Sequence, residues 1–283
     1  MRKPLPWPAR QKDIVISIAL VAARVLGSLF SRRDRMRALE GRPVRGTQSA
    51  PHSAKAFLAG VLFSGLGFLT GGAAAAQTAD PVKDAITSIV ERFVTRANAC
   101  GAKLPYTPGV VVDSHPTLIS FYFEDKSVHA SRWSEMPPEI QGMLSMWAAK
   151  GKLGLDAKGQ FGEVFNSLLV PHELGHFASD FNGRSKGQSF WDGEVYANRV
   201  AIAFWRAEIG DKALAARLDN YNRFLDELPN PVPAGKEPRA WFEANYVALG
   251  NDAQAYGWYQ GLFMREARAL SKTDEFCTII APA

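Results

Sequence analysis

His172-Glu173-Leu174-Gly175-His176 is the stretch of this 283-residue chain from which its fold is best predicted. On a helix, residues i and i+4 lie on one face, because 3.6 residues complete a turn. The two histidines can therefore direct two imidazole rings at one metal ion. Glu173 lies beside them, where its carboxylate could take a proton from a water molecule that the metal activates. The stretch thus predicts a metal site carried by a helix.

The residues around this stretch predict where the helix begins and ends. Apolar residues at helical spacing precede it, namely Phe161, Val164, Phe165, Leu168 and Leu169. Pro171 interrupts that run, and because proline lacks a backbone N–H, we expect a kink or a helix that restarts there. Residues 181–189 are rich in Gly, Asn and Ser, which predicts a loop after the helix.

A second helix, predicted over Trp191–Trp205, supplies the remaining candidate ligand. Catalytic zinc sites use three protein ligands and a water molecule, and Glu194 is the best candidate for the third, with a solvated helix residue as the alternative. Asn198 lies one turn later on the same face and is a candidate to hold a ligand in place. Asp180 is a competing third ligand, or else a supporting or capping residue. Asp192 is expected to cap the N-terminus of this helix.

These residues carry a resemblance to a known group of enzymes. H-E-L-G-H followed by a helix bearing G-E-x-x-A-N resembles the gluzincin metallopeptidases. The pattern is also similar to the ImmA/IrrE-type peptidases and to a group of secreted metallopeptidases of unknown function. The resemblance covers about residues 161–205. It implies that His172, His176 and Glu194 hold one zinc ion and that Glu173 is the general base, and it implies nothing about the substrate.

Peptide hydrolysis would also need a donor that stabilises the oxyanion formed when water attacks a carbonyl. Tyr256 and Tyr259 are one turn apart in an aromatic stretch and are the candidates for this catalytic role. The alternative is that both tyrosines pack in the core. His115 and His129 are the other histidines after residue 76, and nothing in their spacing favours either.

The remaining residues predict an α+β domain that is mainly helical and contains a small β-sheet. Helices are expected over Pro81–Ala99, Pro138–Ala149, Asp211–Leu228, Arg239–Ala248 and Asp252–Leu270. Strands are expected at Gly109–Val112 and Leu118–Phe123, which are rich in β-branched and aromatic residues. The resemblance implies a zincin-like domain, in which an edge strand aligns an extended peptide, and Leu118–Phe123 is the candidate for that strand.

Charge and composition bear on location and partners. Residues 1–76 hold 12 Lys and Arg against 3 Asp and Glu, a net of +9, whereas residues 77–283 hold 21 against 25, a net of −4. Nucleic-acid binding therefore has no support in the main domain. Residues 56–70 form an uncharged apolar core of signal-peptide length, shorter than a membrane span needs, and Ala73–Ala76 offers a cleavage site.

Three parts of the chain follow from these features. We expect a basic extension at 1–55, either disordered or non-physiological, then a signal-peptide region at 56–76 and one zincin-like metallopeptidase domain at 77–283. The domain would be periplasmic or secreted, with a membrane contact only through an uncleaved leader. Cys100 and Cys277 lie near its opposite ends, and in an oxidising compartment a disulfide between them is expected, with two separate thiols as the alternative.

The sequence therefore predicts an exported zinc metallopeptidase that acts on a peptide or protein substrate. The alternative is a non-catalytic zinc-binding protein of the cell envelope, with an interaction or sensor role on a gluzincin-like scaffold. The substrate, the bond it would cleave and the oligomeric state do not follow from the residues.

Overall fold

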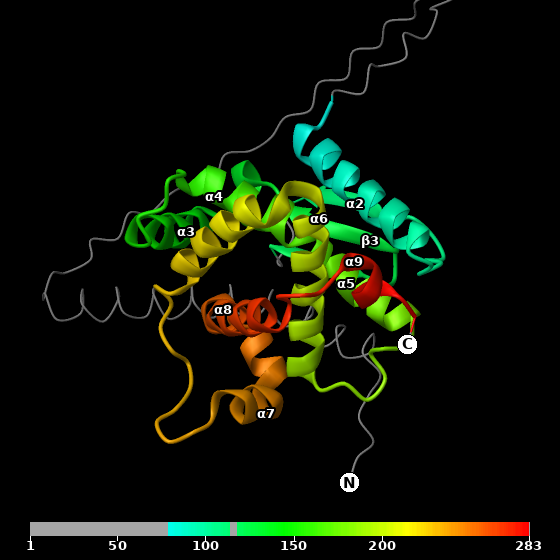
Figure 1. The fold of residues 1–283 in the computed structure, drawn as a ribbon. Coiled ribbons are helices and arrows are strands. Elements are labelled where there is room, and N and C mark those ends of the chain that lie inside the picture. Colours follow the sequence, from blue (N-terminus) through cyan, green and yellow to red (C-terminus); the bar gives the residue numbers. More distant parts are fainter. Residues whose placement is uncertain (1–78, 114–117, 283) are drawn as a thin grey trace, which may run out of the picture. The chain divides into compact units, whose positions relative to one another are not determined.

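The computed structural model describes residues 79–113 and 118–282, in which helices dominate and three short strands form one sheet (Figure 1). The elements in chain order are α2 (Pro81–Ala99), β1 (Gly109–Asp113), β2 (Ile119–Tyr122), β3 (Ser127–Ser131), the 3₁₀ turn η1 (Trp133–Glu135), α3 (Pro138–Lys150), α4 (Ala157–Glu163), the π-helical segment η2 (Val164–Leu168), α5 (Val170–Phe181), α6 (Phe190–Leu225), α7 (Pro238–Gly250), α8 (Ala253–Leu270) and α9 (Phe276–Ile280). The mainly helical α+β prediction is confirmed. The predicted extension at 1–55 and signal region at 56–76 lie outside the described residues.

The sheet has the strand order β1-β3-β2. The central strand β3 pairs in parallel with β1 and antiparallel with β2, so that Val128 lies opposite both Val110 and Phe121. Strand β3 is not predicted by its residues, because Val128 is the only strong strand former among the five and the other four are small or polar. Strand β2 lies within the predicted segment Leu118–Phe123 and forms an edge of this sheet, as expected.

Helix α5 begins immediately after a change in helical hydrogen bonding. Helix α4 ends at Glu163, η2 follows as a π-helical segment, and α5 starts at Val170 with Pro171 in its first turn. A proline is tolerated there because the N–H groups of a first turn have no partner within the helix. The predicted restart of the helix at Pro171 is confirmed.

Helix α6 joins two of the predicted helices, those over 191–205 and 211–228. Gly210 lies between them with φ 77° and ψ 163°, which glycine adopts without steric cost because it has no Cβ. The helix begins after Ser189, whose Oγ accepts a hydrogen bond from the N–H of Asp192 at 3.1 Å. The prediction that Asp192 is the N-cap was wrong, because this residue lies within the first turn of the helix and its carboxylate pairs with Arg239 at 2.7 Å.

Helices α5 and α6 approach each other closely at Gly175. A Cβ atom at this position would lie 3.1 Å from Ala197 Cα and 3.2 Å from Val200 Cβ, closer than nearly all real contacts of that kind. A larger residue here would have to displace its neighbours on α6 by a few tenths of an ångström, so glycine favours this approach. The approach brings His172 and His176 of α5 near Glu194, which lies one turn before Ala197 on α6.

We expect Gly175→Ala to lower the free energy of unfolding by about 1–3 kcal/mol, because the added methyl group meets the backbone of Ala197 and not a movable side chain. Urea denaturation measures this change. Gly162→Ala in α4 is the matched control, since a Cβ there meets nothing within 4 Å. Equal stability of the two variants would contradict this close approach of α5 and α6.

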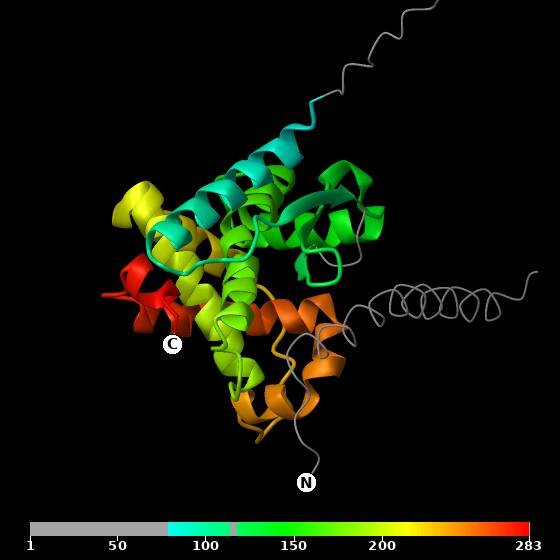
Figure 2. The same cartoon turned by 90° about the vertical axis from the view of Figure 1, so that its right-hand side faces the viewer.

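A disulfide fixes the C-terminal segment. It joins Cys100, at the end of α2, to Cys277 in α9, with the two Cα atoms 4.9 Å apart. Figures 1 and 2 show α9 (red) beside the end of α2 (cyan). The loop after α5 holds the same segment, because Asn182 Nδ2 donates to the carbonyl of Ile280 at 3.0 Å and Arg184 Nη2 to that of Ala281 at 2.8 Å. The predicted bridge is confirmed, and such bonds persist in non-reducing compartments.

Removing the bridge with Cys100→Ala and Cys277→Ala is expected to lower the free energy of unfolding by about 2–5 kcal/mol. The bridge closes a loop over a sequence separation of 177, and its loss frees that loop in the unfolded chain. Denaturant unfolding gives the difference. A reducing agent should reproduce the loss in the parent and have no effect on the double variant. Unchanged stability in both tests would contradict the expected contribution.

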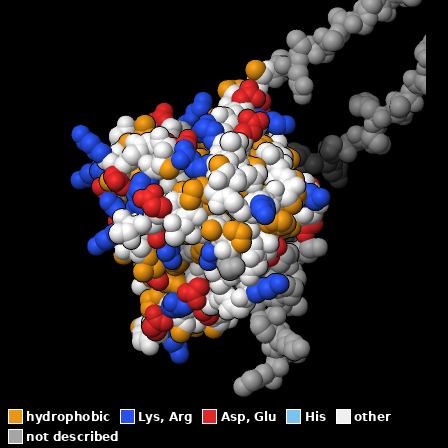
Figure 3. Space-filling view, turned by 45° about the vertical axis from the view of Figure 1, so that its right-hand side comes forward, with side chains coloured by type: hydrophobic (Ala, Val, Ile, Leu, Met, Phe, Trp, Pro, Cys, Tyr) orange, Lys and Arg blue, Asp and Glu red, His pale blue; other side chains and the backbone are white. Residues whose placement is uncertain are grey.

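One face of the described residues mixes charges of both signs. Figure 3 shows acidic and basic side chains lying among one another on one face. That face carries no broad basic field of the kind that attracts a phosphate backbone. Within the described ranges, no helix is both long and apolar enough to cross a membrane.

Candidate metal centre

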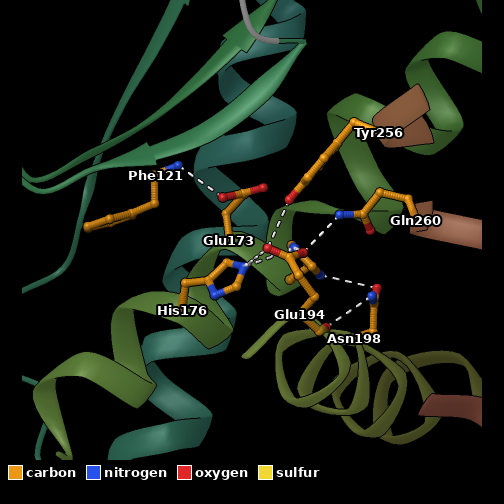
Figure 4. Close-up of polar contacts among 8 residues, drawn as sticks. Phe121, Glu173, His176, Glu194, Asn198, Tyr256 and Gln260 are labelled. Carbon is orange, nitrogen blue, oxygen red and sulfur yellow. Dashed lines mark hydrogen bonds and ion pairs between the residues drawn. The ribbon is translucent and has the colours of Figure 1, made fainter. Parts of the chain in front are cut away.

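Three predicted ligands from two helices converge at one point (Figure 4). Helix α5 supplies His172 and His176, and α6 supplies Glu194. The two histidine Nε2 atoms are 3.1 Å apart, and they lie 3.4 and 3.7 Å from the two oxygens of the Glu194 carboxylate. The three residues are only 2–5% exposed. The buried carboxylate of Glu194 needs a counter-charge, which a protonated His172 or a bound cation would supply.

The cluster is a group of donors that could hold a metal ion. One ligand atom from each residue lies within 4.8 Å of the other two. Among the described residues, no other group of three or more His, Cys, Asp or Glu side chains brings its ligand atoms this close together. The spacing of His172 and His176 by one helical turn, and the approach of α6 at Gly175, produce it.

Asn198 determines which nitrogen of His172 faces the cluster. Its Nδ2 donates to the carbonyl of Glu194 at 3.1 Å, one turn earlier on α6, which directs its Oδ1 toward His172. This Oδ1 lies 3.1 Å from His172 Nδ1 and therefore accepts the hydrogen of that nitrogen. The Nε2 lone pair of neutral His172 is thus left for a metal. The sequence had placed Asn198 in this supporting role, and the contact to His172 agrees with it.

Both oxygens of Glu194 also receive a hydrogen bond from α8. The Tyr256 hydroxyl donates to Oε1 at 2.9 Å, and Gln260 Nε2 donates to Oε2 at 2.8 Å (Figure 4). Tyr256 was among the predicted site residues, whereas Gln260 was not. Its position could have been predicted from spacing, because Tyr256 and Gln260 are i and i+4 on one helix and so share a face.

Glu173 lies beside the cluster and contacts the edge strand. Its Oε2 accepts the backbone N–H of Phe121 in β2 at 3.0 Å, and the residue is 8% exposed. Phe177, one turn after Glu173 on α5, stacks against the Phe121 ring at 5.1 Å between centroids. One face of α5 therefore holds both the side chain and the N–H of Phe121. Burial raises the pKa of Glu173 to about 7, with the charge of His172 opposing the shift.

The other charges in the cluster shift one another's pKa values. Burial raises the pKa of Glu194, but His176, His172 and the bond from Gln260 outweigh it and bring it to about 2. Burial lowers the pKa of His176 to about 4. For His172, burial is outweighed by the bond to Glu194 and by the charges of Glu173 and Glu194, so its pKa is raised. A bound cation would take the place of the proton on His172.

The other candidate residues do not join the cluster. The Tyr259 ring packs 4.9 Å from that of Phe242 and its hydroxyl donates to the carbonyl of Pro238 at 3.2 Å, which is the core position left open as the alternative. Asp180 accepts a bond from Ser185 Oγ at 3.2 Å near the end of α5. His129 Nε2 lies 2.6 Å from Asp125 Oδ2. His115 is outside the described residues.

Comparison with protein-family models, with curated proteins and with solved structures finds no match to this chain. The interpretation of the cluster therefore depends on its own geometry.

Proposed function

We propose that this chain is an exported zinc-dependent metallopeptidase with a zincin-like fold that hydrolyses peptide bonds. The observation that carries the proposal is the cluster of His172, His176 and Glu194, with the carboxylate of Glu173 beside it. Two histidines and one glutamate are a ligand set that catalytic zinc sites use, with a fourth position left open.

The spacing of the ligand atoms supports zinc as the metal. In a tetrahedral site with bonds of about 2.0–2.1 Å, two ligand atoms are separated by about 3.3–3.4 Å. The two histidine Nε2 atoms are 3.1 Å apart and Glu194 Oε2 lies 3.4 Å from His172 Nε2, both near that value, while Glu194 Oε1 lies 3.7 Å from His176 Nε2. A zinc ion held here would polarise the substrate carbonyl and would lower the pKa of a bound water molecule to about 7.

Glu173 is the proposed general base. Its carboxylate takes a proton from the attacking water and then passes it to the amine that leaves. Burial raises the pKa of this carboxyl to about 7 in the metal-free site, and a bound cation would lower it again, which would keep the carboxylate ionised and able to accept a proton. The hydrogen bond from the Phe121 N–H fixes one oxygen of the carboxylate, so that the other is the one available for the proton.

Tyr256 is the proposed donor to the oxyanion. Burial raises the pKa of its phenol well above the usual value of 10, with the charge of Glu194 adding to the shift, so the hydroxyl keeps its proton at neutral pH. The hydroxyl donates its one hydrogen to Glu194 Oε1 at 2.9 Å, so it would turn that hydrogen toward the oxyanion only when the negative charge forms. Tyr259 has no part in this proposal, because its hydroxyl is bonded to Pro238.

Substrate alignment and export complete the proposal. An extended peptide would add to the outer edge of β2, the strand whose Phe121 N–H is bonded to Glu173. The disulfide between Cys100 and Cys277 supports an oxidising compartment, the periplasm or the cell exterior. The apolar core at 56–70 supports a cleaved leader.

Burial of the cluster favours one second candidate, a non-catalytic zinc-binding protein of the cell envelope with an interaction or sensor role. His172, His176 and Glu194 are 2–5% exposed and Glu173 is 8% exposed, so little of the site is open to a substrate. Against this candidate, a purely structural zinc site takes four protein ligands. In the described residues the group contains three.

Hydrolysis of an unfolded test protein such as casein distinguishes these proposals. We expect the purified chain to cleave it, a zinc chelator to stop the cleavage and added zinc to restore it. Cleavage that a chelator leaves unchanged would contradict the zinc mechanism. Stoichiometric zinc without cleavage of casein or of a mixed peptide library would favour the non-catalytic candidate.

A further inference from the structure

We infer that Gln260 is a positioning residue for Glu194, and that Gln260 and Tyr256 together hold the Glu194 carboxylate in one orientation for a divalent cation. The inference rests on the metal site of the proposed function and does not depend on hydrolysis. It assigns helix α8 a direct part in metal binding, although α8 contributes none of the three ligands.

The contacts divide the carboxylate of Glu194 between two helices. Its Oε2 receives Gln260 Nε2 at 2.8 Å and lies 3.4 Å from His172 Nε2. Its Oε1 receives the Tyr256 hydroxyl at 2.9 Å and lies 3.7 Å from His176 Nε2. Each oxygen thus has one donor from α8 and one histidine from α5. Any rotation of the carboxylate would lengthen both bonds from α8 at once.

The side-chain amide of Gln260 has one acceptable orientation. Its Oε1 is buried and has no hydrogen-bond partner among the described residues. Reversing the amide would place this oxygen against Glu194 Oε2, so that two acceptors would face each other and a carboxylate would lose a donor. The donor orientation is retained even though a buried acceptor stays unpaired, which is rare in folded proteins.

Helix α8 is itself fixed before any cation arrives. Tyr259, Phe263 and Met264 on this helix are 0% exposed, and Tyr259 is bonded to the carbonyl of Pro238. Gln260 therefore projects from a rigid element, which is the arrangement that holds a binding site in its productive geometry. Groups that orient metal ligands in this way typically change metal affinity by about 10–100-fold when they are removed.

The test measures zinc affinity of the full chain by competition with a chromophoric chelator. Gln260→Met removes the donor at similar volume, and Gln260→Glu places a carboxylate against Glu194. Gln254→Met is the matched control. It makes the same change of side chain in the first turn of α8, and the backbone N–H of Gln254, which is bonded to Asp252, is kept. Visible absorption of the cobalt-loaded chains and unfolding of the metal-free chains are measured alongside.

We expect both Gln260 variants to bind zinc about 10–100-fold more weakly, and Gln254→Met to bind within about twofold of the parent. The cobalt absorption bands should change in the Gln260 variants only, because a residue that merely stabilises the fold would not alter the metal's coordination. Tyr256→Phe should add a further loss, since it frees the other oxygen of Glu194.

Zinc affinities of Gln260→Met and Gln260→Glu equal to that of the parent would overturn this inference and leave the proposed function standing. An equal loss in Gln254→Met would overturn it as well, because the effect would then belong to the helix and not to the bond. A parent chain that binds neither zinc nor cobalt would overturn both the inference and the proposed function.

Discussion

Replacing Glu173 by Gln is expected to lower the rate of peptide hydrolysis by about 10²–10⁴-fold without loss of the metal. Glutamine has the shape of glutamate, and its Oε1 can still accept the Phe121 N–H that Glu173 accepts at 3.0 Å. It cannot take a proton from water. The metal centre should therefore stay intact while the reaction loses its base. Initial rates on a cleaved test peptide, together with zinc content, measure both properties.

Two controls make this result interpretable. Glu227→Gln changes an exposed glutamate and should leave both the rate and the zinc content unchanged. Zinc affinity of Glu173→Gln should equal that of the parent, because this residue is not one of the three ligands. If Glu173→Gln kept the full rate of the parent, some other group would be the base and the proposed mechanism would be wrong.

The second large effect is expected from His172→Ala, which removes one of three ligands. We expect zinc affinity to fall by more than about 100-fold, beyond the range caused by loss of a supporting residue. The change also leaves Asn198 Oδ1 without the imidazole that it contacts at 3.1 Å, so some loss of stability accompanies it. Chelator competition gives the affinity, and unfolding of the metal-free chain gives the stability.

His129→Ala is the matched control for that variant. His129 lies on β3 with its Nε2 at 2.6 Å from Asp125, outside the cluster, and its removal should leave zinc affinity unchanged. Should His172→Ala bind zinc as tightly as the parent, the assignment of this histidine as a ligand would be refuted. A loss shared equally by both variants would point to general destabilisation.

Residues spaced by one helical turn could be assigned from the sequence. His172 and His176 share a face of α5 because they are i and i+4, and Glu194 and Asn198 share a face of α6 for the same reason. The same rule could have added Gln260 to Tyr256. The spacing of Tyr259 at i+3 from Tyr256 predicts that the two share a face, but the Tyr259 ring is directed into the core.

Contacts between elements could not be assigned from the sequence. The hydrogen bond from Phe121 to Glu173 depends on how β2 packs against α5, and no local pattern encodes that. Strand β3 was missed because its five residues include one strong strand former, so its place in the sheet comes from its neighbours β1 and β2. The cap of α6 was missed because Ser189 and Asp192 are both good capping residues.

The most direct test of the central claim is the zinc content of the purified chain and of Glu194→Ala, determined by elemental analysis after zinc is offered and excess is removed. We predict about one zinc ion per chain in the parent and a clear loss in the variant. A parent that is folded and carries no zinc under these conditions would contradict the account, and so would a Glu194→Ala variant that retains the full complement.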